Sequence, residues 1–159
     1  MDVRVGQGYD IHPFTDGRRL MLGGVEIPHA RGLQGHSDAD VLLHALGDAL
    51  LGAAGLGDLG TYFPPGDVRW KDADSSELLR RIVTEVKNEG WLVGNCDLTV
   101  IAEEPRLLPH RERIRSRIAQ LLGVAPGAVG VKATTNERLG SLGRGEGIAA
   151  LAVVLLKRG

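Results

Sequence analysis

Apolar and polar positions alternate near the start of the chain, and an unbroken apolar run lies near its end. Residues 3–9 alternate in the manner of a strand that buries one face. Pro13 disfavours continued pairing, so we expect this strand to end before it. Residues 148–156 are apolar throughout, and their periodicity fits a helix or a strand. The β-branched Val153 and Val154 favour a strand that is buried on both faces.

Shorter segments predict a hairpin and two further strands. Residues 19–27 place short apolar stretches on either side of Gly23 and Gly24, a glycine pair typical of a tight hairpin turn. Residues 96–101 and 129–133 have the β-branched and apolar composition of strands. The sequence therefore predicts strands in both halves of the chain.

Three segments predict helices. Residues 38–54 carry an apolar stripe at helical spacing, and the hydrogen-bond acceptors at positions 37–40 suit a helix N-terminus. Residues 74–90 begin with a capping signal and continue with a second apolar stripe. The third helix is expected over residues 108–123. Because strands and helices interleave along the chain, we expect an α+β or α/β fold with a mixed sheet.

Composition narrows the classes of protein that fit. The chain has 159 residues, with 43% hydrophobic and 25% charged residues, as expected for one globular domain. A net charge of -1 provides no global basic field for nucleic acid or anionic lipid. The single cysteine, Cys96, excludes an internal disulfide and a cysteine-cluster zinc finger. No apolar run reaches the roughly 20 residues of a membrane helix, and the first ten residues lack the layout of a secretory signal. We therefore expect a cytoplasmic protein.

The pair Asp10-x-His12 is the first feature with metal chemistry. Side chains at positions i and i+2 of a strand point the same way, so this pair can reach one ion, and His44 on the first predicted helix can supply a third ligand. Two imidazoles and one carboxylate leave one tetrahedral position open, as in catalytic zinc sites. Asp40 and Asp48 are each four residues from His44 and are spaced to orient its ring. A chance pair and a half-buried helix histidine also fit these residues.

Further polar clusters suit anion binding or plain capping and turn formation. Residues 36–40 lie at a helix N-terminus, where backbone N–H groups favour phosphate, and His36 is not needed as a cap. Residues 132–138 follow a strand and carry hydroxyl, amide and carboxylate groups. Residues 140–147 are glycine-rich with one arginine, a setting suited to anion contact. This segment is neither a phosphate-binding Walker loop nor a dinucleotide fingerprint.

Taken in chain order, these motifs form a set that resembles the 2-C-methyl-D-erythritol 2,4-cyclodiphosphate synthase family. The matching segments are Gly8-x-Asp10-x-His12, His36-Ser37-Asp38-x-Asp40, His44-Ala45, Gly57-Asp58-x-Gly60, Phe63-Pro64, Pro105-Arg106-Leu107, Lys132-Ala133-Thr134-Thr135 and Gly143-Arg144-Gly145-Glu146-Gly147. The similarity spans essentially the whole chain in collinear order.

The resemblance implies a fold, an assembly and a reaction. The fold would be a single α+β domain over residues 1–159, with a mixed sheet covered by helices on one face. Three copies would pack their sheets around a trimer axis, with active sites between subunits and an isoprenoid diphosphate as a ligand at the axis. The reaction takes 4-diphosphocytidyl-2-C-methyl-D-erythritol 2-phosphate to the 2,4-cyclodiphosphate and releases CMP. The implied cofactors are Zn²⁺ and a second divalent cation, Mg²⁺ or Mn²⁺.

The resemblance also assigns roles to residues. Asp10, His12 and His44 match the zinc ligands, and His36 and Thr135 match the residues that stabilise the transition state. The positions that match substrate contacts are Asp10, Ile11, His12, His36, Ser37, Asp58, Leu59, Gly60, Phe63, Pro64, Pro65, Gly66, Asp67, Ala102, Pro105, Arg106, Leu107, Leu108, Thr134, Thr135, Asn136, Glu137, Ser141 and Arg144. Residues 102–108 among them match the cytidine pocket.

The chain departs from the family pattern at three positions. Pro65 stands where many members have an acidic residue, Ser141 where a bulky apolar residue is common, and Asn136 where a third threonine is common. Two other functions fit the same residues. One is a zinc hydrolase of phosphate esters, and the other is a binding module that holds a nucleotide or an isoprenoid diphosphate without turnover.

Overall fold

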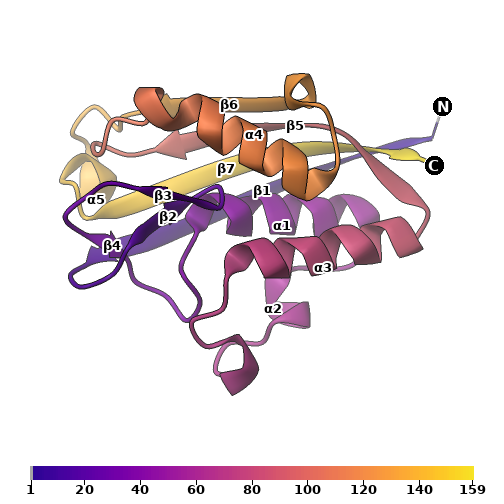
Figure 1. The fold of residues 1–159 in the computed structure, drawn as a ribbon, viewed down its shortest axis with the longest axis horizontal. Helices are drawn as coiled ribbons and strands as arrows, with labels where there is room; N and C mark the ends of the chain where they lie inside the picture. The colour runs from indigo at the N-terminus through magenta and orange to yellow at the C-terminus, as the bar shows by residue number, and fades with distance from the viewer. Residues whose placement is uncertain (1) are drawn as a thin grey trace.

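The fold is built on a five-stranded sheet in the order β4-β1-β7-β5-β6 (Figure 1). We describe it from a computed structural model, which covers residues 2–159. β5 and β6 run parallel and the other neighbours run antiparallel, so the sheet is mixed, as the sequence predicted. A separate hairpin is formed by two short strands. The strands are β1 (Val3–Thr15), β2 (Leu20–Leu22), β3 (Val25–Ile27), β4 (Gly32–Leu33), β5 (Trp91–Ile101), β6 (Val129–Thr134) and β7 (Gly147–Arg158).

The three longest helices cover one face of this sheet (Figure 1). Their apolar stripes join the inward side chains of the strands in one continuous core. The helices are α1 (Val41–Ala54), α2 (Leu59–Tyr62), α3 (Ser75–Asn88), α4 (Arg111–Leu122) and α5 (Gly140–Gly143), with single 3₁₀ turns at Val68–Trp70, Leu108–His110 and Pro126–Ala128. The three predicted helices, the hairpin and the α+β class are therefore confirmed, with boundaries shifted by a few residues.

Two predictions about the strands are wrong. The first strand does not end before Pro13, because β1 continues to Thr15. The neighbouring residue Phe14 donates its N–H to Glu146, so the nitrogen of Pro13 faces away from β7 and the β1–β7 ladder loses no bond there. The run at 148–156 is a strand but is buried on one face only: Leu151 and Val153 keep 43% and 48% of their surface exposed.

Helix α1 lies against β1 with glycine at the points of contact. A Cβ atom added at Gly8 would lie 1.8 Å from the carbonyl oxygen of Ala45, and one at Gly6 would lie 2.0 Å from that of Ala49. No side chain larger than a hydrogen atom fits between the two backbones here. This close approach places His44, the residue before Ala45, over the part of β1 that carries Asp10 and His12.

We predict that Gly8→Ala lowers the free energy of unfolding by about 3 kcal/mol or more, because the new methyl group meets helix backbone and cannot move aside. Urea denaturation of the purified protein measures this value. The same variant should lose affinity for divalent metal, since α1 must shift away from β1.

Gly52→Ala is the matched control on the same helix. An added Cβ there meets nothing within 4 Å, and alanine is a better helix former than glycine, so we expect stabilisation of about 0.5–1 kcal/mol. Equal effects of the two substitutions would contradict a role for the close approach at Gly8.

Candidate functional site

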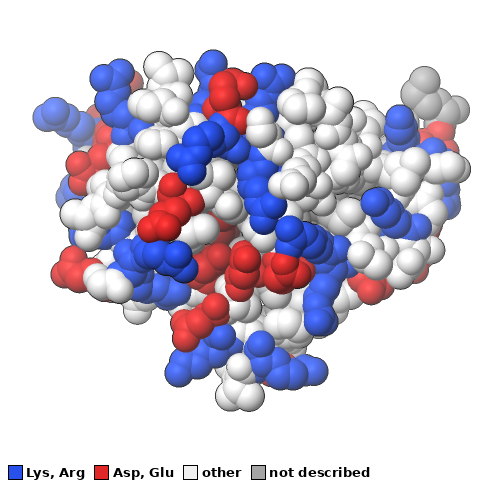
Figure 2. Space-filling view, viewed as in Figure 1, with Lys and Arg blue, Asp and Glu red and all other residues white. Residues whose placement is uncertain are grey.

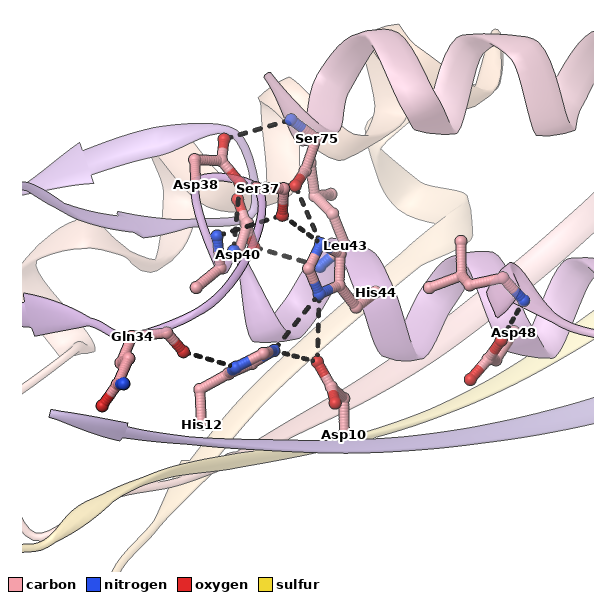
Figure 3. A network of polar contacts seen from close by, with 12 residues as sticks. Asp10, His12, Gln34, Ser37, Asp38, Asp40, Leu43, His44, Asp48 and Ser75 are labelled. Atoms are coloured by element: carbon pink, nitrogen blue, oxygen red, sulfur yellow. Dashed lines mark hydrogen bonds and ion pairs between the residues drawn. The ribbon is translucent and has the colours of Figure 1, made fainter. Parts of the chain in front are cut away.

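Three side chains from two elements converge beneath the start of α1 (Figure 3). The Oδ2 atom of Asp10 lies 2.9 Å from Nε2 of His12 and 3.1 Å from Nδ1 of His44. The two histidine nitrogens lie 3.4 Å apart. Asp10 and His12 share one face of β1 because strand side chains alternate, and α1 brings His44 to them. The predicted convergence of these three side chains is confirmed.

The donor set fits a divalent metal ion of the zinc type. A tetrahedral zinc with bonds of about 2.0–2.1 Å needs ligand atoms roughly 3.4 Å apart, and the three separations are close to that value. The carboxylate oxygen and the two ring nitrogens all lie within 4.8 Å of one another. Each ring also has a hydrogen-bond partner on its far side, as ligating histidines usually do. The Nδ1 atom of His12 lies 2.8 Å from the carbonyl oxygen of Gln34, which sets Nε2 of His12 toward the cluster.

The cluster is electrostatically coupled. Burial raises the pKa of Asp10, but hydrogen bonds and charge from His12 and His44 outweigh burial and bring this pKa down to about 2. Burial lowers the pKa of His12, but the hydrogen bond and the charge of Asp10 outweigh burial, so the pKa of His12 is raised. Asp10 therefore stays a carboxylate throughout the physiological range, which is the form that binds a metal.

The ring of His44 is oriented by serines rather than by the acids predicted from spacing. Its Nε2 atom lies 2.9 Å from Oγ of Ser75 and 3.1 Å from Oγ of Ser37. Asp40 is fully buried and instead accepts backbone N–H groups, including those of Gly23 and Leu43. Burial, together with the charge of the nearby Asp38, raises the pKa of Asp40 to about 6. The prediction that Asp40 orients His44 is therefore wrong. Its carboxylate ties the β2–β3 turn to the start of α1.

Asp48, the other acid predicted to orient His44, accepts the backbone N–H of Leu59 at 2.8 Å. This bond anchors the short helix α2 to α1. The spacing argument failed for both acids because a separation of four residues places an acid near the histidine but does not exclude other partners. Each carboxylate instead accepts backbone N–H groups that tertiary packing brings within reach.

The loop that carries His36 and Ser37 is clamped by Arg18. This guanidinium donates to the carbonyl oxygen of Gly35 at 2.7 Å and also to that of Ser37. The ring of His36 donates from Nε2 to the carbonyl oxygen of Asp67 at 3.0 Å. Sequence analysis missed Arg18, since nothing local relates it to a loop seventeen residues later.

A pocket of about 200 Å³, which we call the metal-side pocket, opens beside the cluster. It is lined by His12, His36, Ser37, His44, Leu59, Gly60, Phe63, Pro65, Trp70 and Leu78. Most of these were predicted as site residues, and Trp70 and Leu78 are additions that the tertiary structure brings in. Asp67 contributes through its backbone contact with His36.

A second pocket of about 280 Å³, which we call the β6 pocket, lies at the end of β5 and β6. It is lined by Ala102, Glu103, Pro105, Arg106, Leu107, Leu108, Ala133, Thr134 and Thr135. Seven of these nine residues were predicted to contact substrate, and all seven lie here together. Several other predicted site residues lie outside both linings, namely Ile11, Asp58, Pro64, Gly66, Asn136, Glu137, Ser141 and Arg144.

Within one chain the two pockets are far apart. Asp10 pairs with Ala150, which pairs with Val100, which pairs with Ala133. Three strand spacings of about 4.8 Å therefore separate Asp10 from the strand that leads into Thr135, a distance of about 14 Å. The structure does not bring the two predicted catalytic residues, His36 and Thr135, to one point in a single chain.

Residues 3–157 match the family model described as the YgbB family. The chain belongs to this family. A relative from Moorella thermoacetica, named 2-C-methyl-D-erythritol 2,4-cyclodiphosphate synthase, is 61% identical over 154 residues, which cover 97% of this chain and 94% of that protein. The relative of the same name from Thiobacillus denitrificans is 58% identical over 158 residues, with 99% of both chains covered. The resemblance stated from the motifs is therefore confirmed.

Solved structures agree with this family assignment. A CDP-bound form of 2C-methyl-D-erythritol-2,4-cyclodiphosphate synthase superimposes with a TM-score of 0.89 at 37% identity, covering 97% of this chain and 100% of that one. The bifunctional IspDF protein from Campylobacter jejuni superimposes with a TM-score of 0.96 at 44% identity. That match covers 99% of this chain and 43% of the longer protein.

The surface and the helices add two observations. From the side viewed in Figure 1, Lys and Arg side chains are interspersed with Asp and Glu, so this face carries no extended field of one sign (Figure 2). Among residues 2–159, no helix has the length and apolar character that a bilayer crossing requires.

We predict that His44→Ala abolishes stoichiometric binding of a divalent metal ion while the fold persists, because a ligand is lost and the apolar stripe of α1 stays intact. Elemental analysis measures bound metal, and circular dichroism measures folding. His110→Ala is the control, since His110 lies on the 3₁₀ turn before α4 and outside the cluster. A His44→Ala protein that still carries one equivalent of metal would refute the assignment of ligands.

Proposed function

We propose that this protein converts 4-diphosphocytidyl-2-C-methyl-D-erythritol 2-phosphate to 2-C-methyl-D-erythritol 2,4-cyclodiphosphate and releases CMP, in the non-mevalonate pathway to isoprenoid precursors. The observation that carries this proposal is the convergence of Asp10, His12 and His44 beside a pocket, in a chain that matches synthases along its whole length. We further propose that the reaction takes place in the cytoplasm, because the one cysteine is free and buried.

The chemistry is a phosphoryl transfer within one substrate. An oxygen of the 2-phosphate forms a bond to the β-phosphorus of the diphosphate, and the bond from that phosphorus to the bridging oxygen of CMP breaks. CMP leaves with that oxygen, so no protein nucleophile is needed. Because two polyanionic groups must meet, the barrier is set by positioning and by neutralisation of negative charge.

The metal-side pocket would hold the reacting phosphates. Asp10, His12 and His44 would hold Zn²⁺, and the ion would supply Lewis-acid stabilisation of negative charge on phosphate oxygens. His36 lines the pocket on a loop held by Arg18. Its Nε2 donates to the carbonyl oxygen of Asp67, so a hydrogen bond to a phosphoryl oxygen would come from Nδ1 of the doubly protonated ring. Removal of one such donor typically slows turnover by about 10²–10³-fold.

The β6 pocket would hold the cytidine and the departing phosphate. Apolar side chains of alanine, proline and leucine line it, together with Glu103, Arg106 and the two threonines Thr134 and Thr135. A relative of known structure is a CDP-bound form, which supports a cytidine site in this family. We propose that Thr135 stabilises the transition state, and that Glu137 contributes to binding of the second divalent cation, Mg²⁺ or Mn²⁺.

A homotrimer reconciles these roles with the distance of about 14 Å between Asp10 and the strand that leads into Thr135. One face of the sheet is bare and apolar: Val5, Tyr9 and Ile11 on β1 are 67%, 55% and 42% exposed, and Leu151 and Val153 on β7 lie beside them. Such a face is typical of a subunit interface. We propose that three copies pack these faces together around a threefold axis, so that the metal-side pocket of one subunit meets the β6 pocket of its neighbour.

The direct experiment incubates purified protein and the cytidyl substrate with zinc and magnesium. We expect cyclic diphosphate and CMP to form in equal amounts. Phosphorus NMR and chromatography measure the two products. Linear hydrolysis products would instead identify a phosphate-ester hydrolase, and binding without turnover would identify a binding module. Either result would overturn the proposed reaction.

A mixing experiment tests the shared site. His36→Ala and Thr135→Ala proteins should each lose about 10²–10³-fold of the turnover rate. When the two variants are co-expressed in equal amounts, about a quarter of the sites in random trimers unite an intact His36 with an intact Thr135 of the neighbour. We therefore expect about a quarter of the wild-type activity. Mixed trimers that stay as inactive as the parents would show that both residues act from one chain.

A further inference from the structure

A chain of hydrogen bonds runs from His44 away from the metal cluster and ends at a carboxylate (Figure 3). Nε2 of His44 lies 2.9 Å from Oγ of Ser75. The hydroxyl group of Ser75 in turn donates to Oδ1 of Asp38, and the backbone N–H of Ser75 donates to Oδ2 of Asp38 at 3.1 Å. The segment around the start of α1, with Asp38 and His44, therefore meets the start of α3, with Ser75, behind the ligand ring.

The directions of these hydrogen bonds follow from the partners of Asp38. Its Oδ1 accepts the backbone N–H of Asp40 at 3.1 Å and its Oδ2 accepts that of Ser75, so both oxygens act as acceptors. The Ser75 hydroxyl must then give its proton to Asp38, and only its lone pairs remain for the ring of His44. Nε2 of His44 therefore carries the proton, and Nδ1 presents its lone pair to Asp10 and His12.

Burial of Ser75 strengthens the hydrogen bonds of this chain, because no water competes for them. Ser75 is 1% exposed, so water cannot take its place, and a buried hydroxyl without an acceptor would be costly. Ser37 also lies near Nε2 of His44, at 3.1 Å, but its oxygen already accepts the backbone N–H of Ala39. With Ser75 serving the ring, the hydroxyl proton of Ser37 stays available to the metal-side pocket that Ser37 lines.

We propose that Ser75 and Asp38 are positioning residues for the metal: together they hold His44 in the tautomer and orientation that a metal ligand needs. The inference rests on the proposed metal site and deepens it. Ser75 is the first residue of α3, so the docking of α3 against the start of α1 sets the affinity for metal. Ser75 is not needed as the cap of α3, because Asp74 is the N-cap and accepts the backbone N–H of Ser76 at 2.8 Å.

The first test measures zinc affinity by competition with a chromophoric chelator. We expect Ser75→Ala to bind zinc about 10- to 100-fold more weakly than wild type, the usual effect of losing the outer partner of a ligating histidine. Ser76→Ala is the matched control: Ser76 is the next residue of the same helix and is 2% exposed, but it does not reach His44. We expect its zinc affinity to equal that of wild type.

The second test uses nitrogen-15 NMR of histidine in the zinc-loaded wild-type protein. The Nε2 proton of His44 should be protected from exchange with water, because it is bonded to a buried oxygen. In Ser75→Ala this protection should disappear. A structural role for Ser75 in helix docking alone would lower stability and would leave both the zinc affinity and the ring proton unchanged.

These measurements separate the two proposals. Wild-type protein that binds no zinc would overturn the proposed function. Wild-type protein that binds zinc, with equal affinity in Ser75→Ala or with a freely exchanging Nε2 proton on His44, would overturn the inference about Ser75 and Asp38 alone. If Ser75→Ala does not fold, a freely exchanging Nε2 proton on His44 in the wild-type protein would still overturn the inference.

Discussion

Helix α1 and strand β1 touch backbone to backbone at Gly6 and Gly8, and the candidate site depends on this contact. A metal cluster needs donors from different segments within a few ångströms of one another. The alternation of side chains along β1 aligns Asp10 and His12, but only the depth to which α1 settles on the sheet brings His44 to them. The packing of α1 on β1 therefore determines where the metal ligands lie. The glycines that permit this packing, Gly6 and Gly8, lie outside the metal cluster.

Polar side chains surround the metal cluster, and each of them holds a different segment in place. The fully buried Asp40 ties the β2–β3 turn to α1, whereas Asp38 joins α1 to α3 through Ser75. Arg18 holds the loop that carries His36. Each of these groups bonds to backbone atoms, so the loop before α1 is held at several points although it has no regular secondary structure. A loop held in this way suits phosphoryl transfer, where preorganised positions lower the barrier.

The sheet has two faces with different environments. Helices bury one face, and the other presents a row of apolar side chains from β1 and β7 to solvent in the isolated chain. The same strands that leave this face bare also keep the two pockets three strand spacings apart. Association through the bare face would remove both difficulties, since it would bury the apolar row and bring pockets of different chains together. Assembly and catalysis are linked in the proposed trimer for this geometric reason.

Much of the local structure was predictable from the sequence. Period-two alternation, helical stripes and capping residues are interactions between near neighbours, so they identified the hairpin, three helices and most strands, and the ordered motifs indicated the family and its ligands. The extension of β1 past Pro13 and the single bare face of β7 depend on which strands pair and which face the helices cover, and no local pattern contains that information. The same holds for Ser75 and Arg18. Their side chains act on segments that are distant in the chain, and only folding decides which polar group meets which.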